Sequence, residues 1–119
     1  MIAHVVLFQP KPGLSEEDRL ELIDALSAAL REIPSVRRAC LGPRITHGRP
    51  YEQLMTVDYS FATILEFDTV ADLKAYLNHP VHERLATHFS ECVEQALMYD
   101  FDVREGEDGL AWIRDAKGR

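Results

Sequence analysis

The sequence predicts a single α+β domain in which strands and helices follow the order β-α-β-β-α-β. Three observations lead to this expectation. Residues 2–9 and 59–67 alternate between two faces, as strands do. Residues 15–33, which lie between them, carry apolar side chains at helical spacing. The chain has 119 residues, 46% of them hydrophobic, which is enough for one core and too little for two ordinary domains.

The first strand is apolar on both of its faces. One face carries Ile2, His4, Val6 and Phe8, and the other carries Ala3, Val5, Leu7 and Gln9. Such a strand is typically covered on both sides. The helix that follows begins at Ser15, a hydroxyl cap followed by acids, and ends before Pro34.

The remaining elements complete the order. A second strand is expected over residues 36–46, followed by a loop over residues 47–58. A short helix starts within residues 68–72, and Pro80 fits the first turn of another helix. The apolar stripe of that helix is Leu85, Phe89, Cys92, Val93 and Ala96. Alternation resumes over residues 97–103, which form the predicted last strand.

This order is that of the ferredoxin-like fold, an antiparallel four-stranded sheet with helices on one face. The other face of the sheet would expose apolar residues such as Val5 and Ile64. Two sheets packed across a two-fold axis would cover both faces, so we expect a homodimer. The fold is expected to occupy residues 1–103. Residues 104–119 form a charged tail, part of which should dock through Trp112 on its own or a neighbouring subunit.

Charge and composition exclude several function classes. The net charge of −7 argues against nucleic acid and anionic membranes as partners. No apolar run approaches the roughly 18–20 residues of a membrane span, and the chain start lacks the basic residues of a signal peptide. Cys40 and Cys92 form no CxxC motif and fit reduced thiols, so we expect a cytoplasmic protein.

Residues 76–82 concentrate groups that can exchange protons near neutral pH. If a helix begins at Pro80, His79 flanks or caps it, and His82 lies in its first turn. The positive end of the helix dipole would keep His82 neutral and able to accept a proton. The alternative is a plain cap at His79 and a partly exposed polar residue at His82. Tyr76 lies three residues before His79.

His4 and Asp100 are unusual residues for apolar strands. His4 is either a buried histidine satisfied by one hydrogen bond or part of a pocket. If its face lies under the helices, His4, Tyr76 and His82 would converge at one cavity. Asp100 either faces a polar pocket or marks a strand edge, and within reach of His82 it would fix the tautomer of that ring.

No metal or cofactor is expected. His82 and His88 are six residues apart, about 240° around a helix, so they cannot share one ion. His79 and His82 are close enough to share one, with a geometry that Pro80 at the helix start leaves open. The sequence has no phosphate-cradling loop or dinucleotide fingerprint, and nothing in it fixes a haem ligand.

The chain resembles the stress-responsive dimeric α/β-barrel (Dabb) family over residues 1–103. The resemblance rests on the first strand with its histidine, the Ile33-Pro34 helix end, the Tyr76…His79-Pro80-x-His82 junction and the closing strand Leu97–Phe101. It implies a ferredoxin-like protomer whose dimer forms an α/β barrel.

Similarity to a plant polyketide cyclase of this family also implies roles for single residues. It implies that His82 is a general base, that Tyr76 holds a carbonyl oxygen, that Asp100 orients His82, and that His4 lies in the pocket. Leu26 and Phe61 stand where that cyclase has a tyrosine and a histidine, so the cavity is expected to differ in shape.

Three functions compete. In the first, the protein binds a small apolar or phenolic molecule in a pocket between sheet and helices. The residues expected to bind it are His4, Val6, Phe8, Thr63, Leu65 and His79. In the second, it is a cofactor-free cyclase or isomerase that uses His82, Tyr76 and Asp100. In the third, it is a non-catalytic structural or interaction protein. A cavity of about 300 Å³ or more that reaches Tyr76 and His82 would favour the first two.

Overall fold

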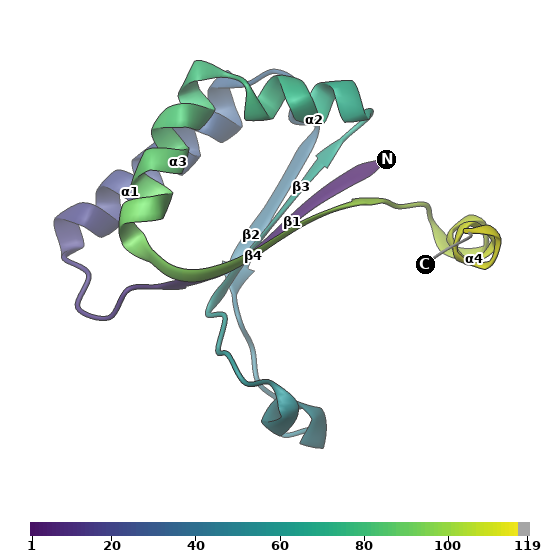
Figure 1. Cartoon of the computed structure of the whole chain (residues 1–119), viewed down its shortest axis with the longest axis horizontal. Coiled ribbons are helices and arrows are strands. Elements are labelled where there is room, and N and C mark those ends of the chain that lie inside the picture. The colour runs from purple at the N-terminus through teal and green to yellow at the C-terminus, as the bar shows by residue number, and fades with distance from the viewer. Residues whose placement is uncertain (117–119) are drawn as a thin grey trace.

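The computed structural model describes residues 1–116 and has the predicted order of elements. The strands are β1 (Ile2–Pro10), β2 (Arg38–Pro43), β3 (Phe61–Phe67) and β4 (Val93–Asp102). The helices are α1 (Glu16–Glu32), the 3₁₀ helix η1 (Pro50–Leu54), α2 (Val70–Leu77), α3 (Pro80–Cys92) and α4 (Gly106–Asp115). The strands form one antiparallel sheet in the order β2-β3-β1-β4, and α1, α2 and α3 lie on the same face of it (Figure 1). The ferredoxin-like α+β fold is therefore confirmed.

The helices begin where the sequence predicts them. Ser15 Oγ accepts a hydrogen bond from the Asp18 amide at 3.1 Å, and three acids occupy the first turn of α1. Thr69 caps α2 in the same way, with the Asp72 amide at 3.1 Å from its Oγ1. Pro80 is at the start of α3. These local caps fix the ends of the helices that cover the sheet.

The predicted boundary between the last helix and the last strand is wrong. We expected Val93 and Ala96 in the helix, whereas α3 ends at Cys92 and β4 begins at Val93. The cause is pairing with the long first strand: Ala96 lies opposite Phe8, and Val93 lies opposite Pro10 across an irregularity in the register. The Lys11 amide also donates to the Cys92 carbonyl at 2.8 Å. Tertiary pairing thus overrides a helical spacing of apolar residues.

Two other segments are better ordered than the sequence suggests. The expected loop over residues 47–58 contains η1, and the Glu52 carboxylate accepts hydrogen bonds from the amides of His47 and Gly48. This segment extends the β2–β3 hairpin beyond the sheet (Figure 1). The expected charged tail forms α4, with Arg104 stacked 4.0 Å from the centre of the Trp112 ring. Docking of the tail on a neighbouring subunit stays a prediction.

The two faces of the sheet differ in what covers them. On the inner face, Leu65 and Phe67 are fully buried and pack with apolar side chains of the helices. On the outer face, cross-strand register places Ile64, Val5 and Tyr99 in one row. Ile64 is 41% exposed and Tyr99 is 56% exposed, and Leu97 and Phe101 of the same face are also exposed. The sheet therefore has one covered face and one bare apolar face.

Candidate functional site

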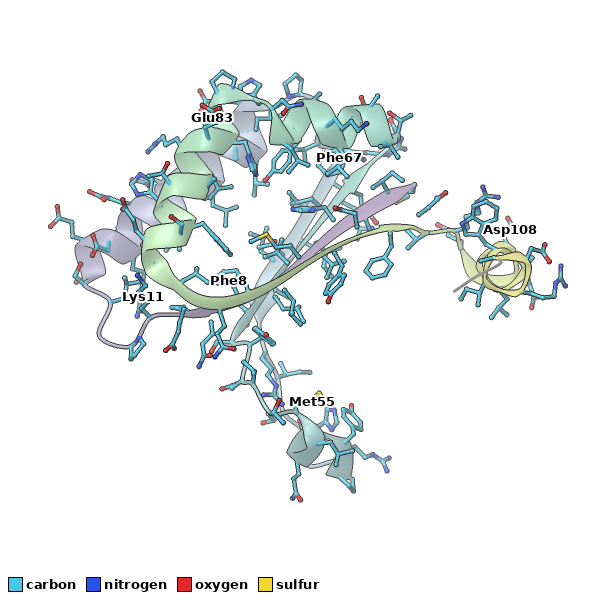
Figure 2. The ribbon with its side chains drawn as sticks, in the orientation of Figure 1. Phe8, Lys11, Met55, Phe67, Glu83 and Asp108 are labelled. Atoms are coloured by element: carbon cyan, nitrogen blue, oxygen red, sulfur yellow. The ribbon has the colours of Figure 1, made fainter. Side chains whose placement is uncertain are left out.

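A cavity of about 590 Å³ lies between the inner face of the sheet and the helices. Its floor comes mainly from β1 and β3, with residues of β2 and β4 at the sides, and its roof comes from α1 and α3 together with Tyr76 of α2. Side chains reach into the interval between sheet and helices from both sides, with Phe8 toward one end and Phe67 toward the other (Figure 2). The volume exceeds the roughly 300 Å³ at which a pocket encloses a small molecule.

Besides His4, the structure places four predicted sheet residues in the wall of this cavity. They are Val6, Phe8, Thr63 and Leu65. Val6 lies directly opposite Thr63 across the β1–β3 ladder, so both side chains project from the inner face. Phe8 contacts Phe89 of α3 edge to face, with ring centres 5.4 Å apart. The strand alternation read from the sequence therefore identified the floor.

Tyr76 and His82 also line the cavity and contact each other. Tyr76 is only 2% exposed, and its ring centre lies 4.7 Å from that of His82, edge to face. Burial raises the pKa of Tyr76 to about 12. At neutral pH its hydroxyl is therefore a phenol that can donate a hydrogen bond into the cavity.

His82 occupies the first turn of α3 and is half-buried. Its pKa is lowered from the usual value, first by burial and then by the charge that His4 would carry, while the backbone of Leu77 opposes the shift. At neutral pH the imidazole is consequently neutral. A neutral imidazole offers a ring nitrogen that can accept a proton, as a binding group or a general base requires.

Asp100 contacts His4 and not His82, which corrects the expected pairing. His4 Nδ1 and Asp100 Oδ1 are 2.6 Å apart. The physical reason is the register of the sheet, since His4 and Asp100 face each other across the β1–β4 ladder. In neutral His4 this hydrogen bond places the proton on Nδ1 and leaves Nε2 as an acceptor. His4 lines the cavity, and its ring centre lies 6.1 Å from that of Tyr76.

His79 does not line the cavity, so its assignment as a binding residue has no support from its position. It is the N-cap of α3, and its Nδ1 accepts a hydrogen bond from the Val81 amide at 3.1 Å. Pro80 thus separates two histidines with different surroundings: His79 ends a loop, and His82 faces the cavity.

Sequence reasoning placed Tyr76, His82 and, through the family resemblance, Leu26 at the cavity, but it missed the rest of the helical wall. The roof includes Leu22 and Leu26 of α1, together with Leu85 and Phe89 of α3. Their helical spacing is the same as that of side chains that fill a core, so periodicity alone could not separate the two cases. Arg19 of α1 also lines the cavity, and only its spacing from Leu22 and Leu26 signals that position.

Within residues 1–116, no group of three or more His, Cys, Asp or Glu side chains is arranged to hold a metal ion. No helix in that range is long and apolar enough to cross a membrane. Cys40 is exposed and Cys92 is buried, and neither forms a disulfide in the described part of the chain.

Compared with known proteins, the chain matches one family model and is similar in fold to many solved structures. The family model for the stress responsive A/B barrel domain matches residues 2–103. A Dabb family protein with a ferredoxin-like fold from Mesorhizobium loti is 28% identical, with a TM-score of 0.68 over 88% of this chain and 97% of that one. No curated protein matches significantly.

Two further solved structures share the fold. The hydroxynitrile lyase from Passiflora edulis has a TM-score of 0.74 at 18% identity, over 88% of this chain and 94% of that one. A dimeric ferredoxin-like protein of unknown function from Thermobifida fusca has a TM-score of 0.67 at 22% identity, over 86% of this chain and 90% of that one.

Proposed function

We propose that this chain, which belongs to the stress responsive A/B barrel domain (Dabb) family, binds a small apolar or phenolic molecule between its sheet and its helices. The observation that carries the proposal is the cavity of about 590 Å³, which reaches Tyr76 and His82. A purely structural role would require no cavity of this size beneath the helices, because protein interiors are otherwise close-packed.

The chemistry of the wall defines the class of ligand. Most of the lining side chains are aliphatic or aromatic, which favours an apolar body. Tyr76 supplies a donor and His82 an acceptor among these apolar groups, and His4 adds a ring nitrogen that can hydrogen-bond. A phenolic hydroxyl or a carbonyl oxygen placed beside them would satisfy polar groups that are costly to leave unpaired.

The experiment is a calorimetric titration of the purified protein with 4-hexylphenol. We expect saturable binding of one molecule per chain. Leu26→Trp puts a larger side chain into the cavity roof and should weaken binding at least about tenfold, since overfilling a packed space costs one to a few kcal/mol.

Leu20→Trp is the matched control, because Leu20 is on the same helix, is exposed and does not line the cavity. It should bind 4-hexylphenol as the wild type does. Absence of saturable binding, or equal weakening by both variants, would reject the proposed function.

A second function, proton transfer to and from an enolisable substrate, is favoured by the neutral state of His82. In this proposal His82 removes a proton next to a carbonyl group while Tyr76 donates a hydrogen bond to the carbonyl oxygen. The test follows hydrogen–deuterium exchange of 4-phenyl-2-butanone in D₂O by NMR. His82→Gln should lower the protein-dependent rate by about 100-fold or more. Exchange no faster than in buffer would contradict catalysis and leave binding as the function.

We further propose that two copies associate through the outer face of the sheet. Four exposed apolar side chains of that face support this: Ile64, Leu97, Tyr99 and Phe101. The similar structure from Thermobifida fusca is described as dimeric. We keep the cytoplasm as the proposed compartment, because a reducing environment is compatible with the two unpaired thiols.

A further inference from the structure

The end of the cavity opposite Tyr76 and His82 carries a cationic side chain, Arg19, with no assigned role. The carbonyl of Asp18, the residue before it, accepts a hydrogen bond from Cys92 Sγ at the last residue of α3, whereas His82 is in the first turn of that helix. Arg19 lines the cavity one helical turn before Leu22 and Ile23, which also line it. Spacings of three and four residues place these side chains on one face of α1, so Arg19 continues the stripe of the helix that faces the cavity.

Arg19 has no acidic partner within residues 1–116. The arginines that do pair with acids there are Arg37, Arg38, Arg44 and Arg114. Glu16, one turn before Arg19, forms no ion pair with it, and Glu21, two residues after Arg19, lies on another side of α1, 3.9 Å from His88 of α3. A cation in the first turns of a helix is also disfavoured by the helix dipole. Arg19 is exposed, so its guanidinium lies at the open rim of the cavity, without an ion-pair partner among the described residues.

The two polar ends of the cavity are well separated. Along α3 the wall extends from His82 to Ser90, eight residues or about 12 Å at 1.5 Å per residue. Along β1 it extends from His4 to Pro10, six residues or about 20 Å at the rise of a strand. Apolar side chains such as Leu26 and Phe89 line the space between. The cavity is therefore elongated, with hydrogen-bonding groups at one end and a guanidinium at the other.

We propose that the ligand is an elongated amphipathic acid, with a phenolic or carbonyl oxygen at Tyr76 and His82, an apolar body, and a carboxylate at Arg19. This inference rests on the proposed binding function and specifies its ligand. A guanidinium can donate two parallel hydrogen bonds to a carboxylate, which makes Arg19 a determinant of specificity at the cavity end.

The test compares two ligands that differ only in charge, 6-(4-hydroxyphenyl)hexanoate and its primary amide, with 4-hexylphenol as the reference. We expect the wild type to bind the acid about fivefold more tightly than the amide, the upper range for an ion pair that remains in contact with water. Arg19→Gln should bring this ratio to about one and leave 4-hexylphenol unaffected, and Arg19→Lys should keep part of the preference.

Arg31→Gln is the matched control, since Arg31 is exposed on the same helix and does not line the cavity. It should retain the preference for the acid. Binding of 4-hexylphenol without any preference for the acid, or a preference that survives Arg19→Gln, would overturn this inference alone. Failure of all three ligands to bind the wild type would reject the binding function and this inference with it.

Discussion

The two faces of the sheet are both apolar, yet helices cover only one of them. Leu65 and Ile64 are neighbours in β3: Leu65 is buried beneath the helices, and Ile64 is 41% exposed on the opposite side. On the inner side the helices cover the sheet without filling the space above it. On the outer side no element of residues 1–116 forms a covering layer (Figure 1). Apolar character alone therefore does not define a core, because the inner face lines a cavity and the outer face is available to a second copy.

The largest expected effect comes from a charge on the outer face. Tyr99→Glu would bury an unpaired carboxylate between two sheets, which should raise the dimer dissociation constant by at least about 100-fold, because such a charge costs several kcal/mol. Light scattering at micromolar concentration should then report the 13.6 kDa chain mass instead of twice that mass.

Leu20→Glu introduces the same charge at an exposed apolar position of α1 and should leave the dimer intact. A wild-type protein that already has the mass of one chain would contradict the role of the outer face, as would equal dissociation by both variants.

On the inner face, alkaline pH should reveal the burial of Tyr76. The pKa is about 12 in the folded chain and about 10 when unfolded, so the unfolded chain loses its proton first and stability falls as pH rises from 10 to 12. The expected loss is about 2–3 kcal/mol, at 1.36 kcal/mol per pKa unit.

Urea unfolding at pH 9 and at pH 11.5 should register most of this loss, about 2 kcal/mol, and Tyr76→Phe should show less of it. Tyr51→Phe, at an exposed tyrosine of the hairpin, should behave as the wild type does. If Tyr76→Phe has the same alkaline loss as the wild type, the phenol is not buried as described.

A smaller effect is expected from His82 in acid. Because its folded pKa is lowered, the unfolded chain binds the proton first as pH falls below about 6.5, and the folded state loses stability. Chemical unfolding from pH 7.5 to 5 should therefore be less pH-dependent in His82→Gln than in the wild type. His47→Gln, in the exposed hairpin, should keep the part of the pH dependence of stability that comes from His82. An identical pH dependence in His82→Gln and wild type would contradict the burial of this ring.

Much of this arrangement could be predicted from the sequence because local chemistry fixes it. Alternation in β1 and β3 identified the inner residues Val6 and Leu65, and the caps at Ser15 and Thr69 identified the helix starts. The start of β4 could not be found in this way, since Val93 continues a helical stripe until its pairing with β1 is known. Likewise, the hydrogen bond of Asp100 depends on register between strands almost a hundred residues apart in the chain.

The smallest expected effect tests that register. Asp100→Ala removes the acceptor beside His4 Nδ1, so the His4 ring should no longer be held in one tautomer, while the His82 ring is unaffected. Nitrogen-15 NMR of the histidine rings distinguishes the two tautomers. If the His82 signals changed and the His4 signals did not, Asp100 would contact His82 as the sequence predicted, and the structure would be contradicted.

The central claim is that the inner face binds a ligand and the outer face does not. The most direct measurement is a titration of methyl-labelled protein with 4-hexylphenol, observed at Leu65 and Ile64, adjacent residues on opposite faces of β3. We expect saturable shifts and ligand-to-methyl contacts at Leu65, with Ile64 unchanged. Contacts at Ile64 without contacts at Leu65, or no shift at either residue, would contradict the claim.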